Sequence, residues 1–151
     1  LLQEKGVSVF DIDRGGEVTL HAPGQLVIYP ILDLRKYGKD LHAYMHRLEQ
    51  VGIDFLSEYD VAAVRNPGKT GVWIGTEKIA SIGIGVKKWI SYHGMAININ
   101  TDLNLFQLIN PCGMRIQMTS LAQLKGQKLD LSQIKAKFIN IFCKNFQLDI
   151  L

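Results

Sequence analysis

The segment 79–86 constrains the fold most, because its side chains alternate between two classes. Apolar side chains share one face of the extended chain and the smallest side chains share the other: Ala80, Ile82, Ile84 and Val86 against Ser81, Gly83 and Gly85. Glycine weakens a strand, and the usual reason for it is the close approach of another backbone or of a ligand. We therefore predict a strand with one buried face, whose opposite face accepts either tightly packed protein or a ligand.

The rest of the chain alternates between strand-like and helical patterns. A helix over 41–57 is predicted after the N-cap residue Asp40, and two further helices after Ser120 and Asp130, with Gly126 ending the first of these two. Strands are predicted over 7–10, 26–32, 61–65, 71–75, 78–87 and 91–100, with a turn at Gly75-Thr76-Glu77. These elements predict one α/β (α+β) domain, a mixed β-sheet with packed helices.

The composition is that of a globular protein of mild charge. Hydrophobic residues make up 47% of the 151 residues, and the formal net charge is +3. Such a charge does not by itself indicate nucleic acid, and it fits a local basic patch for an acidic partner at least as well. No apolar run approaches membrane-spanning length and no signal peptide is visible. We expect a cytoplasmic protein with no nucleic-acid or membrane partner.

Two cysteines, Cys112 and Cys143, are fewer than a secreted disulfide framework usually has, so both are expected to be reduced thiols. Cys143 falls in a helical pattern, where free cysteine usually packs as a small hydrophobic residue. Cys112 stands between Pro111 and Gly113, on a shaped loop of the kind that displays reactive groups. Cys112 is therefore the candidate nucleophile.

Lys78 opens the strand with the alternating faces. A thiol has an ordinary pKa of about 8.5, and a nearby ammonium lowers that pKa by favouring the thiolate. If Lys78 lies beside Cys112, the pair supplies both a nucleophile and a proton acceptor. Spacing alone favours another interpretation, in which Lys78 is a solvated turn lysine that follows Glu77.

Two further runs have little side-chain bulk and adjoin imidazoles. Residues 14–16 (Arg-Gly-Gly) and 22–25 (Ala-Pro-Gly-Gln) flank a stretch that ends at His21, and residues 94–96 (Gly-Met-Ala) follow His93. Each run alone is more often structural than functional. Together with the candidate thiol and amine, they provide the groups that covalent acyl transfer requires. The two predicted strands with small side chains would form the floor of a groove for a linear acyl chain.

Four motifs, in this order, resemble the lipoyl(octanoyl) transferase family, also called octanoyl-[acyl-carrier-protein]:protein N-octanoyltransferase. They are Arg14-Gly15-Gly16-x-Val18-Thr19-x-His21-x-Pro23-Gly24-Gln25, Lys78-Ile79-Ala80-Ser81-Ile82-Gly83, His93-Gly94-x-Ala96-x-Asn98 and Asn110-Pro111-Cys112-Gly113. The resemblance covers nearly the whole chain and implies a fold related to the catalytic domains of biotin and lipoate protein ligases. It implies an acyl-cysteine intermediate at Cys112, with Lys78 tuning the thiol. The substrate-lining residues that it implies are Arg14, Gly15, Gly16, Glu17, Val18, Thr19, Leu20, His21, Ser81, Ile82, Gly83, Gly94, Met95 and Ala96.

The same resemblance implies an acyltransferase of lipoate biosynthesis with no cofactor and no metal. The implied donor is octanoyl-acyl carrier protein, and the implied acceptors are lipoyl domains of 2-oxoacid dehydrogenases and the glycine cleavage H protein. Residues 1–151 would form a single acyltransferase catalytic domain that lacks its N-terminal segment, since the family usually has more chain before the first motif. Ala22 stands where the family usually has glycine. Several basic residues would face the acidic carrier, unless they are only a solvated surface: Arg35, Lys36, Lys39, Lys87 and Lys88.

Two other functions remain open. One is an ATP-dependent lipoate or biotin ligase-like enzyme on the same fold, which would need an adenylate site and no cysteine nucleophile. The other is a non-catalytic module that binds lipoyl domains or acyl carriers. Cys112 in its motif argues against the ligase, and the presence of both Lys78 and Cys112 argues against the binding module.

Overall fold

The computed structural model describes residues 6–16, 18–109 and 116–149 of the chain. Within these ranges five strands form one sheet, in the order β1-β5-β4-β3-β2, and every neighbouring pair is antiparallel. The strands are β1 (Gln25–Ile28), β2 (Val64–Asn66), β3 (Lys69–Ile74), β4 (Glu77–Lys87) and β5 (Ile90–Asn98). The helices are α1 (Leu41–Ser57), α2 (Leu121–Lys125) and α3 (Leu131–Phe146), with two short 3-10 helices, η2 (Leu34–Tyr37) and η3 (Leu103–Leu108).

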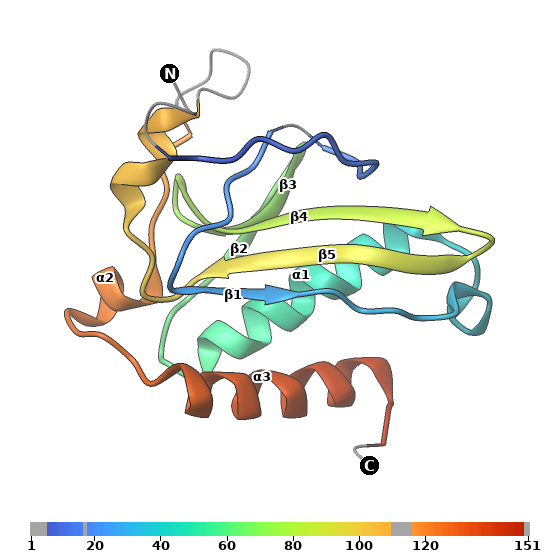
Figure 1. Cartoon of the computed structure of the whole chain (residues 1–151). Coiled ribbons are helices and arrows are strands. Elements are labelled where there is room, and N and C mark those ends of the chain that lie inside the picture. Colours follow the sequence, from blue (N-terminus) through green and yellow to red (C-terminus); the bar gives the residue numbers. More distant parts are fainter. Residues whose placement is uncertain (1–5, 17, 110–115, 150–151) are drawn as a thin grey trace.

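The two faces of the sheet are covered differently (Figure 1). The long helices α1 and α3 lie below one face, and the hydrophobic core between them and the sheet includes Val51, Phe55 and Val72, none of which is exposed. Gly52 lets α1 approach β3, because a Cβ there would lie 2.8 Å from Val72 Cγ2. The other face is crossed by an extended segment, residues 7–16. That face therefore has room for a site that the helical face does not offer.

The predicted helices are confirmed, and their starts have the expected caps. Helix α1 has the bounds 41–57, and the Asp40 side chain accepts a hydrogen bond from the Ala43 N–H at 3.0 Å. Ser120 caps α2 in the same way through the Gln123 N–H at 3.2 Å, and Asp130 caps α3. Gly126 ends α2 in the left-handed conformation with φ 67°. These local signals fix the helix boundaries before any packing is considered.

The alternating segment forms β4, as predicted. Ala80 and Ile82 belong to the buried core, and Ile84 packs against it. On the opposite face, a Cβ at Gly83 would lie 2.8 Å from the carbonyl oxygen of Gly15, whose own N–H donates to Ile84 O at 2.9 Å. The absence of a side chain at Gly83 therefore permits the close approach of another segment of the backbone, the one that contains Gly15.

Four details differ from the sequence predictions. The strand predicted over 61–65 begins only at Val64, as β2. Residues 7–10 form no strand and pair with no strand among the described residues, because this segment runs over the open face of the sheet and not along one of its edges. The strand predicted over 26–32 ends at Ile28. Pro30 has no N–H for a ladder, and the Ser91 hydroxyl donates to its carbonyl oxygen at 2.8 Å instead. The parallel part of the predicted mixed sheet is one isolated bridge between Lys78 and Met118.

Candidate active site

A cavity of about 1050 Å³ lies on the open face of β4 and β5, bounded by the crossing segment and by η3. Ligand pockets commonly measure about 300–1,000 Å³. Most of the predicted site residues line it: Arg14, Gly16, Val18, Thr19, His21, Lys78, Ser81, Ile82, Gly83, Gly94, Met95 and Ala96. Gly15 is bound to β4 through Ile84 and Leu20 is buried, and neither is part of the wall. Glu17 and Cys112 lie outside the described residues.

Lys78 is placed by an irregularity in the sheet. Val72 pairs with Ala80 but Trp73 pairs with Lys78, so β4 contains one residue more than β3 between these pairs. A bulge of this kind changes the direction of neighbouring side chains and is common next to active sites. The Lys78 Nζ lies 5.4 Å from the centre of the Trp73 ring, within the range of a cation–π interaction. Lys78 is thus held against the cavity wall.

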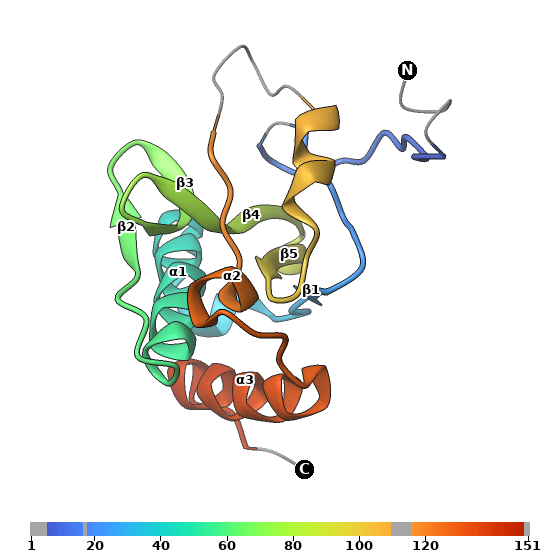
Figure 2. The ribbon, with the colours of Figure 1, turned by 90° about the vertical axis from the view of Figure 1, so that its left-hand side faces the viewer.

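The backbone of Lys78 is bound to the chain that follows the Cys112 motif (Figure 2). The Lys78 N–H donates to Gln117 O at 2.8 Å, and the Thr119 N–H donates to Lys78 O at 3.0 Å. Figure 2 shows this stretch running down past the start of β4 toward α2. The last described residue before the motif, Ile109, and the first after it, Ile116, both line the cavity. The described chain on both sides of the Cys112 motif therefore borders the cavity.

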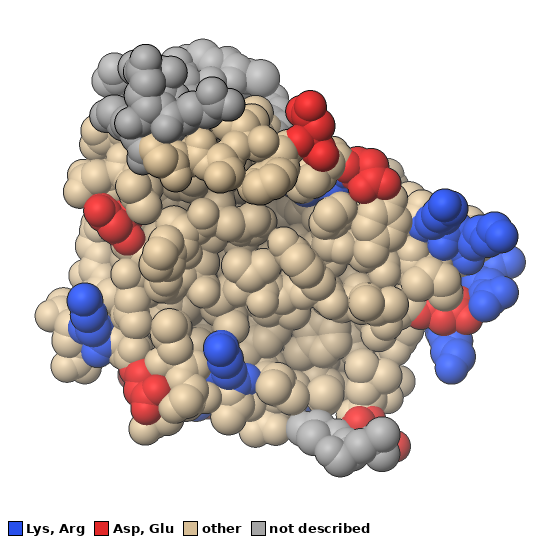
Figure 3. Space-filling model, viewed as in Figure 1, with Lys and Arg blue, Asp and Glu red and all other residues tan. Residues whose placement is uncertain are grey.

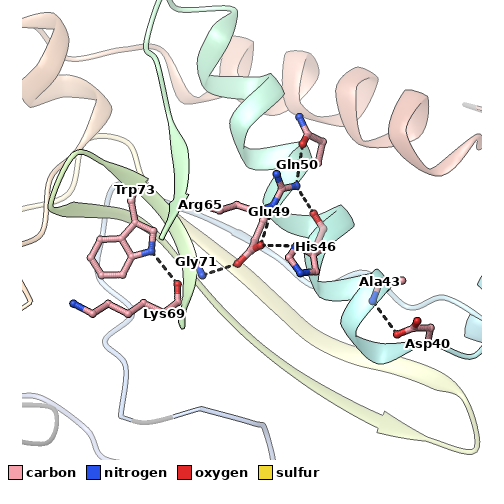
Figure 4. Close-up of polar contacts among 9 residues, drawn as sticks. All are labelled: Asp40, Ala43, His46, Glu49, Gln50, Arg65, Lys69, Gly71 and Trp73. Atoms are coloured by element: carbon pink, nitrogen blue, oxygen red, sulfur yellow. Dashed lines mark hydrogen bonds and ion pairs between the residues drawn. The ribbon is translucent and has the colours of Figure 1, made fainter. Parts of the chain in front are cut away.

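Three residues near Lys78 were not predicted from the sequence: Lys69 and Trp73, which line the cavity, and Gly71, which lies against the Lys78 side chain. Figure 4 shows all three. Trp73 is almost fully buried, and its indole N–H donates to Lys69 O at 3.2 Å. The Lys69 Nζ lies 5.7 Å from the centre of the same ring. The predicted turn included Glu77 as well. A turn of residues 75 and 76 alone pairs Trp73 with Lys78, so the register of the β3–β4 hairpin was the sequence signal that could have identified this contact.

A chain of polar side chains anchors the first motif to β5. His21 Nδ1 lies 3.2 Å from Gln25 Oε1, and Gln25 Nε2 donates to Asn98 Oδ1 at 2.9 Å. Asn98 is almost fully buried, and its Nδ2 donates to Thr119 O at 3.1 Å. Gly24 allows this arrangement, because its φ is 88° and a Cβ there would lie 2.6 Å from the Asn100 carbonyl carbon. His21 and Asn98 therefore connect the first motif to the chain that follows the Cys112 motif.

The cavity extends along β4 and β5 to His93, which has φ 55° in the middle of a strand. The Tyr92 hydroxyl donates to Asp13 Oδ2 at 2.9 Å, and His93 Nε2 lies 3.5 Å from Asp13 Oδ1. The hydrogen bond from Tyr92, assisted by His93, lowers the pKa of the Asp13 carboxyl, and the same bond raises the pKa of Tyr92. These contacts attach the crossing segment to β5 at this end of the cavity.

A family model for the lipoyl protein ligase A/B catalytic domain matches residues 1–143. The chain belongs to this family. The octanoyltransferase of Solibacter usitatus (strain Ellin6076) is 45% identical over 151 residues, which are 100% of this chain and 68% of that protein. The chain spans about two thirds of the length of the curated relatives that it matches. The family that the motifs indicated is thereby confirmed.

The fold expected for this family is confirmed by solved structures. A crystal structure of lipoate-protein ligase A bound with ATP matches with a TM-score of 0.78 at 15% identity, over 99% of this chain and 63% of that one. The biotin protein ligase of Aquifex aeolicus matches with a TM-score of 0.65 at 17% identity, over 82% of this chain and 53% of that one. At such identities the likeness concerns the fold alone.

In this member of the family, basic side chains gather at one end of the molecule (Figure 3). Exposed Lys87 and Lys88 lie at the β4–β5 turn, and exposed Arg35 and Lys36 lie in η2. The Leu34 N–H donates to Trp89 O at 2.7 Å, which joins η2 to that turn. The predicted clustering of these residues is therefore present, at the end of β4 opposite to Lys78.

No helix of the described residues has both the length and the apolar character needed to cross a membrane. Nor do three or more His, Cys, Asp or Glu side chains of those residues come together as a metal site would require. Cys143 is half-buried on α3 and does not line the cavity.

Proposed function

We propose that this chain transfers an octanoyl group from acyl carrier protein to a lysine of a lipoyl domain, through a thioester on Cys112. Relatives named octanoyltransferase support the type of reaction. The observation that carries the proposal is convergence on one cavity: Lys78, Ile109 and Ile116 all line it. A thiol presented between Ile109 and Ile116 would then act in the same space as the Lys78 amine.

In the first half-reaction the Cys112 thiolate attacks the carbonyl carbon of the octanoyl thioester. The Lys78 ammonium favours the thiolate, because an opposite charge stabilises the ionised form. The negative oxygen of the tetrahedral intermediate is stabilised by backbone N–H donors near Gly83 or Cys112. The bond from carbon to the carrier sulfur then breaks, and the departing carrier thiolate takes a proton from Lys78. The products are octanoyl-Cys112 and the carrier thiol.

In the second half-reaction a lysine amine of the lipoyl domain attacks the same carbonyl carbon. Lys78, now neutral, accepts a proton from the attacking amine. The bond to Cys112 sulfur breaks and an amide remains on the acceptor. Exchange of a thioester for an amide is downhill, so the reaction as proposed needs neither ATP nor a metal. One amine thus serves first as the partner of the thiolate and then as a base.

The acyl chain has a suitable path along the open face of the sheet. Ser81 of β4 and Ala96 of β5 present small side chains to the cavity, and Gly83 presents none. Burying apolar surface contributes roughly 25 cal/mol per Å². We place the octanoyl chain along these residues, with its carbonyl end toward Lys78.

An ATP-dependent ligase is the second candidate, because the family model that matches residues 1–143 describes lipoyl protein ligase A/B catalytic domains. Such an enzyme activates a free acid as an adenylate and requires no cysteine nucleophile.

Intact-mass measurement distinguishes the transferase from the ligase. After mixing with octanoyl-acyl carrier protein, we expect one octanoyl adduct, absent from Cys112→Ser and kept by Cys143→Ala. An adduct mapped to Cys143 would overturn the assignment. Adenylate formation from ATP and octanoate would establish the ligase, and neither product would leave a binding module.

The finer identities of the partners belong to the same proposal. We propose lipoyl domains of 2-oxoacid dehydrogenases and the glycine cleavage H protein as acceptors. We also propose a cytoplasmic setting, because a reducing compartment keeps the Cys112 thiol available as a nucleophile. Octanoyl transfer to purified lipoyl domain and to H protein, measured side by side, tests the acceptors.

A further inference from the structure

Glu49 on α1 is surrounded by hydrogen-bond donors from Gly71 and Arg65 and by the His46 ring (Figure 4). It is 7% exposed, although it carries a carboxyl group. Its Oε1 accepts the Gly71 N–H at 3.1 Å, and its Oε2 accepts from Arg65 Nε at 3.1 Å. His46 Nδ1 lies 3.4 Å from the same Oε2. A buried carboxylate is costly unless its oxygens are paired, and here both are.

Gly71, the partner of Oε1, lies directly against the Lys78 side chain. Its φ is 127°, a conformation that residues with a side chain rarely adopt. A Cβ at Gly71 would lie 2.5 Å from Lys78 Cε, 3.3 Å from Lys78 Nζ and 2.5 Å from Ala80 O. The Lys78 stem therefore occupies space that exists only because this residue is glycine in this conformation.

We propose that Glu49 is a positioning residue for Lys78, acting through the Gly71 amide. One carboxylate oxygen holds β3 so that Gly71 stays open toward Lys78, and the other is held by Arg65 and approached by His46. The lysine stem then runs between Gly71 and the Trp73 ring into the cavity. The functional value of this placement rests on the role proposed above for Lys78.

The position requires a carboxylate and not merely a polar side chain. The Gly71 amide and the Arg65 guanidinium are both donors, so two acceptor oxygens are needed. Glutamine has nearly the same shape but only one acceptor, and its NH₂ would face one of these donors. Glu49→Gln therefore removes one of the two contacts while leaving the size of the side chain almost unchanged.

The test measures Lys78 directly and needs no substrate. Trace acetylation is followed by peptide mass spectrometry, with exposed Lys135 as the internal reference. We expect Glu49→Gln to raise Lys78 labelling several-fold, because the stem is no longer confined, and to speed hydrogen exchange at the Gly71 amide. Asp40→Asn is the matched control: it removes the same charge from the same helix but keeps an N-cap side chain of equal quality. Asp40→Asn should leave both the labelling of Lys78 and the hydrogen exchange of the Gly71 amide unchanged.

A double-mutant cycle separates this pathway from a general loss of stability. Gly71→Ala should displace Lys78 by itself, so Glu49→Gln should add little to it, whereas independent effects would add. Unchanged Lys78 labelling in Glu49→Gln, or full additivity with Gly71→Ala, would overturn the inference. If Glu49→Gln does not fold, Arg65→Lys decides. Arg65→Lys keeps the positive charge but loses the contact from Arg65 Nε to Glu49. It should therefore also raise Lys78 labelling, and unchanged Lys78 labelling in this variant would overturn the inference as well.

Kinetics then connect the placement to the proposed reaction. In Glu49→Gln we expect kcat for transfer to fall about 10–100-fold, as expected when a reacting group is misplaced, with KM nearly unchanged. Altered Lys78 labelling without transfer in the wild-type chain would refute the proposed function but not the positioning. Normal Lys78 labelling in Glu49→Gln, together with active transfer by the wild-type chain, would refute the positioning role but not the proposed function.

Discussion

Lys78 is fixed by its neighbours through both its backbone and its side chain. Its N–H and C=O bind Gln117 and Thr119, so the start of β4 and the chain after the Cys112 motif are one hydrogen-bonded unit. Its side chain lies against Gly71 and reaches the Trp73 ring. An amine fixed in this way has a defined position relative to the cavity, which a surface lysine lacks. That makes the chemistry of Lys78 testable by single substitutions.

The first prediction concerns the charge of Lys78. Lys78→Ala should move the pH dependence of Cys112 alkylation to higher pH, since an opposite charge nearby commonly lowers a thiol pKa by about 1–3 units. Lys78→Arg keeps the charge but cannot accept a proton near neutral pH. It should therefore preserve most of the alkylation profile and still lose transfer to the acceptor lysine. Iodoacetamide rates against pH check both variants; an unchanged profile in Lys78→Ala would show that the lysine does not influence the thiol.

The second prediction concerns Gly83. A side chain there must displace Gly15 O, which would lie 2.8 Å from the new Cβ, and Arg14 Cδ at 2.9 Å. Overpacking of this kind typically costs about 1–3 kcal/mol. We expect Gly83→Val to stay folded at moderate temperature, to expose the crossing segment to proteases and to block acylation of Cys112. Limited proteolysis and intact mass check this. Normal acylation in Gly83→Val would place the acyl chain elsewhere.

Single residues differed in how far the sequence could predict them. The glycines of the first motif and of β4 were recognisable, since glycine within a strand needs a compensating contact. That the contact at Gly83 is Gly15 could not be foreseen, because it joins segments far apart in the chain. Glu49 was hidden in the apolar pattern of α1, where a single carboxyl group gives no periodic signal. The role of Cys112 stays a prediction.

At the scale of elements, η2 and the β4–β5 hairpin are joined through Asp33. Its carboxyl group receives two bonds from Arg35, Nε to Oδ1 at 2.8 Å and Nη2 to Oδ2 at 2.7 Å, and also accepts the Arg35 N–H. The Arg35 guanidinium lowers the pKa of Asp33 from 3.8 to about 2. The backbone of Asp33 forms a bridge with Ile90. This contact therefore stabilises the end of the sheet where the basic residues gather.

The third prediction follows from that pKa. A carboxyl group whose pKa is lowered by folding stabilises the protein above its unfolded-state pKa, and the stabilisation is lost as the pH falls through the folded-state value. Asp33→Asn should thus lower the melting temperature at pH 7, and the difference from wild type should shrink between about pH 4 and about pH 2. Arg35→Gln should reproduce this pattern. A melting-temperature difference from wild type that is equal at the two ends of this pH range would exclude the ion pair as its cause.

Helices were predicted from sequence with more success than strand ends. Asp40, Ser120 and Asp130 fix the helix starts through bonds to their own first turns, which are local. Residues 7–10 have a strand-like composition, but a strand requires a partner, and this segment lies over the open face of the sheet without one. The bulge that sets the direction of Lys78 also depends on pairing between β3 and β4. Features set by distant segments were therefore the ones missed.

At the scale of the whole molecule, the basic end and the Lys78 end are far apart. Lys78 and Lys87 lie near opposite ends of β4, nine residues apart, which corresponds to about 30 Å at a rise of about 3.3 Å per residue. The part of β4 that lines the cavity runs from Glu77 only to Gly83. Exposed charges act strongly only within a Debye length, about 10 Å at 0.1 M salt. The basic end therefore has little direct influence on the reacting groups.

The fourth prediction decides whether that end binds the carrier. From the distance, we expect Lys87→Glu combined with Lys88→Glu to leave kcat/KM for octanoyl-acyl carrier protein close to wild type, at low and at physiological salt. Lys135→Glu combined with Lys144→Glu, both exposed on α3, is the matched control for the same change of net charge away from the site. A small octanoyl thioester, which makes no protein contact, gives the baseline. If KM rises for the carrier but not for the small thioester, and the double control on α3 has no such effect, the carrier docks at the basic end. The arm that carries its acyl group would then have to reach along the whole cavity to Lys78.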